Sequence, residues 1–190
     1  MNKVAILKEI IFSNKLILEK ISEYAKKLNK IYAKEKLVII SVLNGSVFFT
    51  TRLASLLKID LEIDFIAVSS YNDNKKKSKT HFYKELKINI ANKNVLIIED
   101  IIDSGKTIGL VYEFLKKLNP KHIRLCSLIM SGKNRKTNNN NFTFSIDRLL
   151  TLNNDSWIVG FGIDFQEKFR NLTDIYSIQW SKSKELIKIK

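Results

Sequence analysis

The chain has 190 residues, of which 45% are hydrophobic and 27% are charged, and this size and composition are typical of one globular domain. No apolar run approaches the roughly 20 residues that a membrane-spanning helix needs, and residues 1–11 lack the pattern of a secretion signal. A single cysteine, Cys126, excludes an internal disulfide and a cysteine-rich zinc site. We therefore expect a cytoplasmic protein with no membrane partner.

The charge is strongly positive, because the chain has 33 Lys and Arg residues and 19 Asp and Glu residues, which gives a net charge of +14. Such an excess favours an anionic partner such as a nucleic acid, a membrane surface or a phosphorylated substrate. The lysines are scattered, however, and no basic cluster is interleaved with aromatic residues as in single-strand binders. We attribute the bulk charge to composition and expect no nucleic-acid partner, so phosphate binding must rest on a specific site.

Hydrophobic periodicity predicts alternating helices and strands. Ser13 is suited to cap the first, amphipathic helix, and continuous β-branched runs predict strands that are buried on both faces. The predicted helices cover residues 13–36, 47–57 and 108–118, and the predicted strands cover residues 37–43, 61–69, 82–88, 94–99, 122–130, 142–146, 157–161 and 175–180. A mobile loop is predicted at 71–80, a turn at 100–107 and a polar loop at 131–141.

This alternation is typical of an α/β fold, in which a mostly parallel, twisted sheet is flanked by helices on both faces. Ligands bind to such sheets at the carboxyl ends of the strands. Polar and charged residues follow the predicted strands at 44–45, 70–71, 99–107, 131–135 and 160–164. The sequence therefore predicts a ligand site built from these five segments.

The most informative segment is VLIIEDIIDSGKT, residues 95–107. An apolar strand leads to two adjacent acids, Glu99 and Asp100. Neighbouring carboxylates repel one another unless hydroxyl groups or a cation lie between them, so they suit a ribose diol or a magnesium ion carried by a polyphosphate. The alternative is a pair of capping and salt-bridge residues, but the phosphate-type turn that follows favours a ligand.

That turn opens a helix at residues 104–107. Gly105 allows a tight backbone turn, and amides at a helix N-terminus form a site for a phosphate, with hydroxyl groups of Ser104 and Thr107 as further donors. The segment is not a Walker A loop, because that motif requires a glycine where this chain has Asp100. The dinucleotide-binding glycine pattern is also absent from the sequence.

Residues 99–107, EDIIDSGKT, resemble the phosphoribosyl-diphosphate motif of the type I phosphoribosyltransferases, and most of all their hypoxanthine-guanine members. The resemblance extends over about residues 38–178. It implies that Glu99 and Asp100 bind the ribose hydroxyls and that Asp103 is the base at N7 of the incoming purine. It also implies that the 5′-phosphate is held by Ser104, Gly105, Lys106 and Thr107.

Further segments match the family in the same order. The turn at Asn44 and Gly45 resembles the diphosphate-binding turn, which in this family often contains a cis peptide at the position of Leu43–Asn44. Ser70 and Tyr71 match the start of a loop that closes over the site. Arg170 matches an arginine that contacts the diphosphate, a task suited to a guanidinium.

The base half of the site is matched by residues 157–164, WIVGFGID. The resemblance implies that Trp157 stacks on the purine and that backbone groups of Ile158 read its edge. It also implies a Mg²⁺ cofactor, with Glu99, Asp100 and Asp164 as metal ligands.

Two positions depart from the family. Many members carry Lys or Arg where this chain has Asn44, so one cation is missing from the diphosphate turn. The family lysine that bonds the purine 6-oxo group has Ser131 as its ungapped counterpart, and Lys133 lies two residues later. We take Lys133 as the candidate for this contact. Its loss would weaken the preference for 6-oxopurines over adenine.

The resemblance implies one phosphoribosyltransferase domain over residues 1–190, with a core at about 37–165 and a small hood from the terminal segments. It implies a homodimer or homotetramer that transfers phosphoribose from phosphoribosyl diphosphate to hypoxanthine or guanine. Three alternatives remain: transfer to another base such as xanthine, adenine or a pyrimidine, a regulatory RNA-binding homologue suggested by the positive charge, and a homologue that has lost activity.

Overall fold

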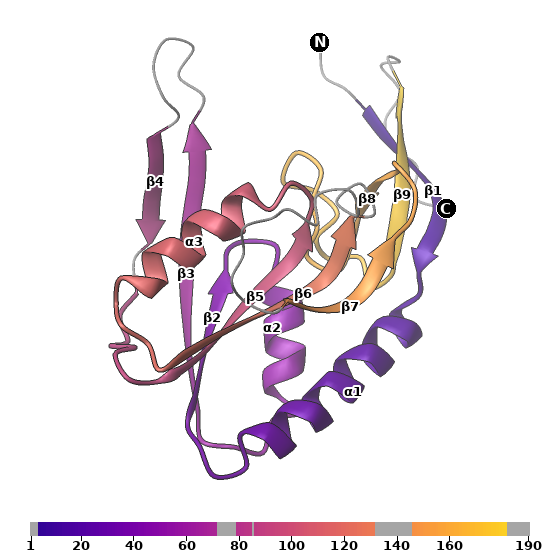
Figure 1. The fold of residues 1–190 in the computed structure, drawn as a ribbon. Helices are drawn as coiled ribbons and strands as arrows, with labels where there is room; N and C mark the ends of the chain where they lie inside the picture. Colours follow the sequence, from indigo (N-terminus) through magenta and orange to yellow (C-terminus); the bar gives the residue numbers. More distant parts are fainter. Residues whose placement is uncertain (1–3, 72–78, 85, 132–145, 182–190) are drawn as a thin grey trace.

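The computed structural model describes residues 4–71, 79–84, 86–131 and 146–181. Three helices and nine strands are found there, and helices alternate with strands from β1 to β3 and again from β5 to β6 (Figure 1). They are β1 (Val4–Phe12), α1 (Asn14–Ile31), β2 (Leu37–Val42), α2 (Val47–Ala54), β3 (Leu61–Tyr71), β4 (Lys79–Lys84), β5 (Asn94–Ile102), α3 (Lys106–Lys116), β6 (His122–Ser131), β7 (Ile146–Leu152), β8 (Trp157–Val159) and β9 (Ile175–Ser181).

The larger sheet has six strands in the order β4-β3-β2-β5-β6-β7. Neighbouring strands from β3 to β7 run parallel, and only the edge strand β4 pairs antiparallel, with β3. The carboxyl ends of the parallel strands therefore meet at one edge of the sheet, where ligands bind in folds of this kind. The predicted α/β architecture with a mostly parallel sheet is confirmed.

Helices cover both faces of this sheet. Successive residues of a strand point to opposite sides, so each strand contributes to the core on both faces. On β2, Leu37 and Ile39 join a core cluster with α1 and α2, whereas Val38 and Ile40 join another cluster with α3. Figure 1 shows α1 and α2 close to each other, whereas α3 lies away from both. The predicted cap of α1 is confirmed, since Ser13 Oγ accepts the Leu16 N–H.

A second, three-stranded antiparallel sheet has the order β1-β9-β8. It joins the two ends of the described chain, and its three strands are called the hood below (Figure 1). Strand β1 was not among the predicted elements. In β1 apolar and polar residues do not alternate, because apolar residues such as Ile6 and Ile10 lie on the exposed side while Ala5 lies on the buried side. Irregularities also interrupt its register with β9.

Several predicted boundaries are wrong. Helix α1 ends at Ile31 and not at residue 36, α2 ends at Ala54 and not at residue 57, and α3 covers Lys106–Lys116 and not 108–118. Strand β5 does not end at Glu99 but continues through Ile102, because pairing with β6 extends to Ile102 and Met130. The acidic pair therefore lies in the strand and not before a turn. The strand predicted at 82–88 is β4, Lys79–Lys84, so the ends of the predicted loop at 71–80 are strand. The strand predicted at 157–161 ends at Val159, since Gly160 and Phe161 have positive φ angles.

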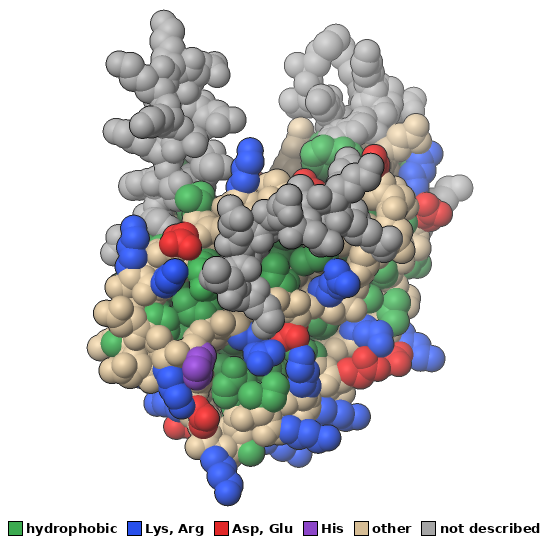
Figure 2. All heavy atoms as spheres, viewed as in Figure 1, with side chains coloured by type: hydrophobic (Ala, Val, Ile, Leu, Met, Phe, Trp, Pro, Cys, Tyr) green, Lys and Arg blue, Asp and Glu red, His purple; other side chains and the backbone are tan. Residues whose placement is uncertain are grey.

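Two predicted loops and one strand fall largely outside the described residues: 72–78, 132–141 and 142–145. Strand β7 begins at Ile146, where the predicted strand at 142–146 ends. Lys and Arg side chains lie at many separate places on the surface shown in Figure 2. No helix in the described part of the chain has the length and apolar character to cross a membrane.

Candidate active site

The acidic pair lies at the carboxyl end of β5, and both side chains are nearly buried, with exposed fractions of 8% for Glu99 and 9% for Asp100. Asp100 Oδ1 accepts the Ile101 N–H at 2.9 Å. Among the described residues Glu99 Oε2 has no hydrogen-bond partner. Burial, and then the neighbouring charge of Asp100, raise the pKa of Glu99 well above its ordinary value. A buried carboxylate oxygen without a partner indicates a position completed by a ligand.

The turn after β2 touches this pair directly. The peptide bond between Leu43 and Asn44 is cis, as the resemblance implies. A Cβ added at Gly45 would lie 1.7 Å from Asp100 Oδ2, and a Cβ added at Gly162 would lie 2.0 Å from the Gly45 carbonyl oxygen. Only glycine fits at position 162, where an added Cβ would meet backbone, and a side chain at position 45 would require the Asp100 carboxylate to move. The turn therefore packs closely between β5 and the segment after β8.

The predicted phosphate turn precedes α3. Gly105 is the N-cap residue with a φ of 72°, in the left-handed region that glycine adopts readily. A cavity of about 150 Å³ is lined here by Glu99, Asp103, Ser104, Gly105 and Thr107, together with Ile101, Ile102 and Ile108. Its size and the helix N-terminus suit one phosphate group. Lys106 is exposed and does not line this cavity.

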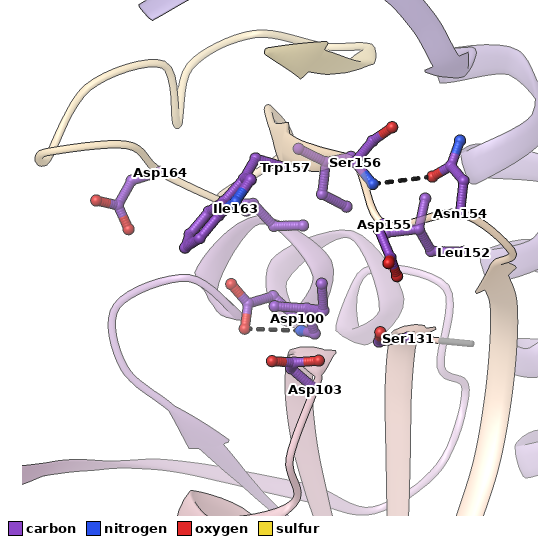
Figure 3. Close-up of a pocket in the computed structure, with 12 residues that line it drawn as sticks. Asp100, Asp103, Ser131, Leu152, Asn154, Asp155, Ser156, Trp157, Ile163 and Asp164 are labelled. Atoms are coloured by element: carbon purple, nitrogen blue, oxygen red, sulfur yellow. Dashed lines mark hydrogen bonds between the residues drawn. The ribbon is translucent and has the colours of Figure 1, made fainter. Parts of the chain in front are cut away.

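A larger cavity of about 330 Å³ adjoins this turn and shares Asp103 with it. Asp100 and Asp103 come from β5 and its end, and Trp157 and Ile163 face them from the hood side (Figure 3). Trp157 is 62% exposed, so its indole ring is available to a flat ligand. The other lining residues are Ile101, Ser131, Leu152, Asn154, Asp155, Ser156, Ile158 and Asp164.

Arg170 and Asp164 form one local network. Arg170 Nη2 lies 2.9 Å from Asp164 Oδ1 and 2.7 Å from Glu167 Oε2, and Arg170 Nη1 donates to the Gly162 carbonyl at 2.8 Å. Asp164 Oδ2 accepts the Glu167 N–H at 2.9 Å. The arginine therefore fixes the loop that carries Asp164 at the rim of the larger cavity.

The three predicted metal ligands do not form one cluster. Within the described residues, no group of three His, Cys, Asp or Glu side chains could hold a metal ion together. Glu99 and Asp100 are neighbours in β5, whereas Asp164 pairs with Arg170. Asp164 lies apart from Asp100 (Figure 3).

Of the remaining predicted residues, Ser70 and Tyr71 belong to β3, but their side chains are not described, and Lys133 lies outside the described residues. The sequence analysis missed Leu152, Asn154, Asp155 and Ser156 in the larger cavity. The signal that could have found them is a polar run, NNDS at 153–156, directly after a strand. Ser131, noted only as a departure from the family, also lines the cavity.

Comparison with known proteins agrees with this geometry. Residues 8–166 match the phosphoribosyl transferase domain family. Hypoxanthine phosphoribosyltransferase from Buchnera aphidicola is 37% identical over 92% of this chain and 97% of its own length. Hypoxanthine-guanine-xanthine phosphoribosyltransferase from Tritrichomonas foetus is 34% identical over 87% and 88% of the two chains.

A solved structure shares the fold as well. The crystal structure of hypoxanthine-guanine phosphoribosyltransferase from Bacillus anthracis, with a HEPES molecule in its active site, matches with a TM-score of 0.82 and 34% identity. The match covers 93% of this chain and 99% of that one. The chain therefore belongs to the phosphoribosyltransferase family, on the branch that contains the hypoxanthine and hypoxanthine-guanine phosphoribosyltransferases.

Proposed function

We propose that this protein transfers the phosphoribosyl group from phosphoribosyl diphosphate to hypoxanthine or guanine, with release of diphosphate, and so acts in purine salvage. The observation that carries the proposal is the pair of cavities that share Asp103. One has the size and donors for a phosphate, and the other has an exposed tryptophan for a planar base. A nucleoside monophosphate has these two ends, separated by a ribose.

The proposed roles follow from this arrangement. The 5′-phosphate binds the turn at Ser104–Thr107, the ribose hydroxyls bind Glu99 and Asp100, and the purine stacks on Trp157 beside Ile158. Asp103, at the junction of the two cavities, accepts or shares the proton at N7 while N9 attacks the anomeric carbon. Loss of the diphosphate gives this carbon an oxocarbenium-like character, which the neighbouring carboxylates stabilise.

A magnesium ion fits this donor set when it arrives with the substrate. Mg²⁺ prefers oxygen ligands and is usually held by one or two carboxylates together with substrate phosphates. The unpartnered Glu99 oxygen, with Asp100 beside it, provides such a position, and Asp164 provides another across the site. When bound, the ion would neutralise charge on the departing diphosphate.

The diphosphate is assigned to the turn at Asn44–Gly45, beside Asp100, with Arg170 as the nearby cation. Three of the Arg170 N–H contacts go to Gly162, Asp164 and Glu167, which leaves other N–H groups of the guanidinium for the diphosphate. Asn44 contributes no charge, so the backbone of the turn carries more of this binding than in family members with a basic residue there.

The test is release of diphosphate from phosphoribosyl diphosphate and Mg²⁺, with hypoxanthine, guanine, xanthine, adenine and uracil added in turn. We expect release with hypoxanthine or guanine, and none when Mg²⁺ is chelated. If none of the five bases caused release, the transferase proposal would be wrong, and salt-dependent RNA binding would then be measured for the regulatory alternative.

Xanthine is a second candidate base. The cavity carries Ser131, with a neutral hydroxyl, where the family has a lysine, and the Tritrichomonas foetus relative is named for xanthine as well as hypoxanthine and guanine. In the same assay, a rate with xanthine comparable to that with guanine would favour this wider specificity.

We also propose that the whole chain is one phosphoribosyltransferase domain and that it assembles as a homodimer or homotetramer in the cytoplasm. Light scattering of the purified protein measures the mass directly, and a monomer at micromolar concentration would contradict the assembly.

A further inference from the structure

Three buried hydroxyl groups lie directly behind the turn after β2. They belong to Ser41 in β2, Ser46 at the end of the turn and Thr50 in α2, and none of the three side chains is more than 1% exposed. The rest of β2 is apolar. A polar group buried in this way is costly unless it is hydrogen-bonded, so its partners define its role.

The hydrogen bonds form a chain with one direction. Ser46 Oγ donates to the Val42 carbonyl at 2.6 Å, and a carbonyl can only accept. Because a hydroxyl has one proton, Ser46 must accept the bond from Ser41 Oγ at 2.6 Å. Thr50 Oγ1 then donates to Ser41 Oγ at 2.8 Å. Every hydroxyl in the chain donates once, and the chain ends on the last residue of β2.

This chain joins the two ends of the turn. Val42 precedes the turn and Ser46 follows it, so the bond between them closes residues 43–45 into a loop. Ser46 is the N-cap residue of α2, where a serine side chain usually accepts an amide of the first helical turn, but it makes no capping bond here. The Ser46 hydroxyl therefore stabilises the turn, through its bond to the Val42 carbonyl, and does not cap the helix.

The turn itself presents free donors. In the described part of the chain, no hydrogen bond is found for the amide N–H groups of Asn44 and Gly45. Gly45 lies between the Asp100 carboxylate and Gly162, as the short distances from an added Cβ show. The bond from Ser46 to the Val42 carbonyl holds the two ends of the turn together.

We propose that Ser41, Ser46 and Thr50 are positioning residues that hold this turn in the shape that binds the diphosphate group. This inference rests on the proposed function of the turn. Because Asn44 supplies no cation, diphosphate affinity depends on the direction of the backbone amides, and these directions depend on the buried chain of hydroxyls.

The chain offers a matched pair of neighbouring threonines for the test. Thr50→Val keeps the side-chain shape and removes the bond to Ser41. Thr51→Val makes the same change at an exposed residue of α2 whose hydroxyl bonds only to Val47 and Phe48 carbonyls within the helix. Thr50→Ser restores the hydroxyl, and Ser46→Ala breaks the chain at the turn itself.

Binding of diphosphate and of phosphoribosyl diphosphate, each with Mg²⁺, is measured by calorimetry, and the KM for each is measured by turnover. We expect Thr50→Val, which removes one buried hydrogen bond, to weaken both affinities by about 3- to 10-fold. Ser46→Ala removes two such bonds and should weaken them by about 10-fold or more. The KM for hypoxanthine should stay at the wild-type value in all the variants. The control Thr51→Val and the conservative variant Thr50→Ser should also keep the wild-type melting temperature.

Two kinds of failure are distinguishable. If the wild type binds phosphoribosyl diphosphate and turns over, but a folded Thr50→Val and Ser46→Ala bind diphosphate as the wild type does, the positioning role is wrong. An equal rise in the KM for hypoxanthine and for phosphoribosyl diphosphate would also contradict it, because a general structural loss would not single out the diphosphate. If the wild type binds neither ligand, the proposed function fails.

Discussion

Asp103 is the residue at which the two cavities meet. It lines both of them, and its side chain is exposed at the end of β5, so it is placed to reach a base in one cavity while a phosphate occupies the other. We expect Asp103→Asn to lower kcat by about 10²- to 10⁴-fold, the usual contribution of a general base. The KM for phosphoribosyl diphosphate should change little, since the phosphate turn is untouched.

Steady-state kinetics with hypoxanthine measures both constants for this variant. Because the Asp103 side chain is exposed, the Asp103→Asn variant should have the same melting temperature as the wild type. Full turnover by Asp103→Asn would show that the proton at N7 is handled elsewhere.

Gly45 leads to a second prediction at this scale. A methyl group at position 45 would collide with the Asp100 carboxylate, which would have to turn away toward the larger cavity that Asp100 lines. We expect Gly45→Ala to weaken phosphoribosyl diphosphate binding by more than tenfold and to destabilise the fold by about 1–3 kcal/mol, as overpacking does.

Gly109→Ala is the control for Gly45→Ala. Gly109 lies inside α3, where alanine is favoured over glycine by about 1 kcal/mol. Binding by calorimetry and urea unfolding separate the two effects. Unchanged binding in Gly45→Ala would mean that the turn and the acidic pair are not coupled.

The candidate site could be predicted where function leaves a local signal. The acids of β5 and the turn at 104–107 stand together in the sequence, and the structure places them together. The contacts of Gly45 with Asp100 and Gly162 join residues that are far apart in the chain, and no local pattern encodes such an approach. Asp155 and its neighbours were missed because the strand that precedes them was not predicted.

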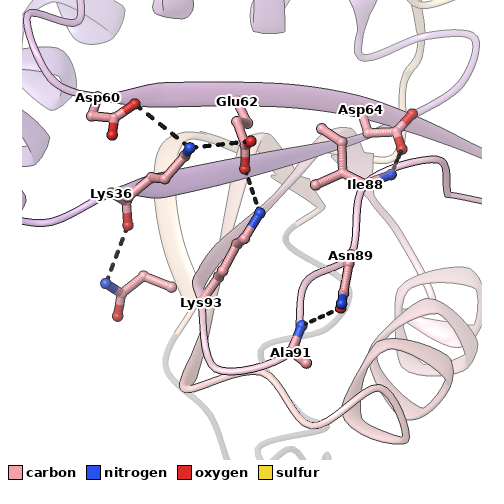
Figure 4. Close-up of polar contacts among 9 residues, drawn as sticks. Lys36, Asp60, Glu62, Asp64, Ile88, Asn89, Ala91 and Lys93 are labelled. Atoms are coloured by element: carbon pink, nitrogen blue, oxygen red, sulfur yellow. Dashed lines mark hydrogen bonds and ion pairs between the residues drawn. The ribbon is translucent and has the colours of Figure 1, made fainter.

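At the scale of elements, Asp64 fastens the chain after β4 to β3. Its buried carboxylate accepts a bond from the Ile88 amide at 3.0 Å (Figure 4). It also accepts a bond from the Lys84 ammonium at 2.8 Å, and the Lys87 amide is a further donor. Burial alone would raise the pKa of Asp64, but the bonds from Lys84 and from backbone amides override it and lower the pKa to about 2.

This shift makes stability depend on pH in a defined direction. The pKa of an aspartate in the unfolded chain is about 3.9, so the stabilisation by Asp64 is complete above about pH 4 and is lost as the pH falls through about 2. A difference of this size corresponds to about 2.5 kcal/mol. Asp64→Asn should therefore be destabilised by roughly this amount at pH 7, and its deficit should shrink between pH 4 and pH 2.

Urea unfolding at pH 7, 5, 3 and 2 measures the effect. Asp60→Asn is the matched control, because Asp60 is 69% exposed and its contact with Lys36 is 3.9 Å long (Figure 4). An exposed pair contributes about 0–1 kcal/mol. A deficit of Asp64→Asn that stays constant with pH would contradict the role of the charged carboxylate.

Elements with strong internal periodicity were predictable, and elements defined by distant partners were not. The amphipathic helix α1 begins within one residue of its predicted start but ends five residues before its predicted end, and the buried strand β2 covers all but the last of its predicted residues, because each carries its own pattern. Strands β1 and β4 are edge strands whose bounds follow from pairing with β9 and β3. The base of the hairpin at 86–88 is shaped by Asp64, more than 20 residues away, and not by its own sequence.

At the scale of the whole molecule, the candidate site lies between two sheets. The acids belong to β5 of the six-stranded sheet and the turn at 104–107 leads from β5 into α3, whereas Trp157 and Ile158 belong to β8 of the hood. A nucleotide that occupies both cavities therefore joins the two sheets, while ribose 5-phosphate or a free base contacts mainly one of them. Ligands that bind only the folded state raise its stability in proportion to their affinity.

We accordingly expect IMP, the nucleotide of hypoxanthine, to raise the melting temperature by more than the summed effects of ribose 5-phosphate and hypoxanthine at equal concentration. Trp157→Ala should remove most of this excess and leave the shift with ribose 5-phosphate unchanged, because an exposed ring contributes little to the free protein. Differential scanning fluorimetry over a range of ligand concentrations measures each shift. Strictly additive shifts in the wild type would mean that base and phosphate are bound independently, and the two sheets would then contribute separate sites instead of one.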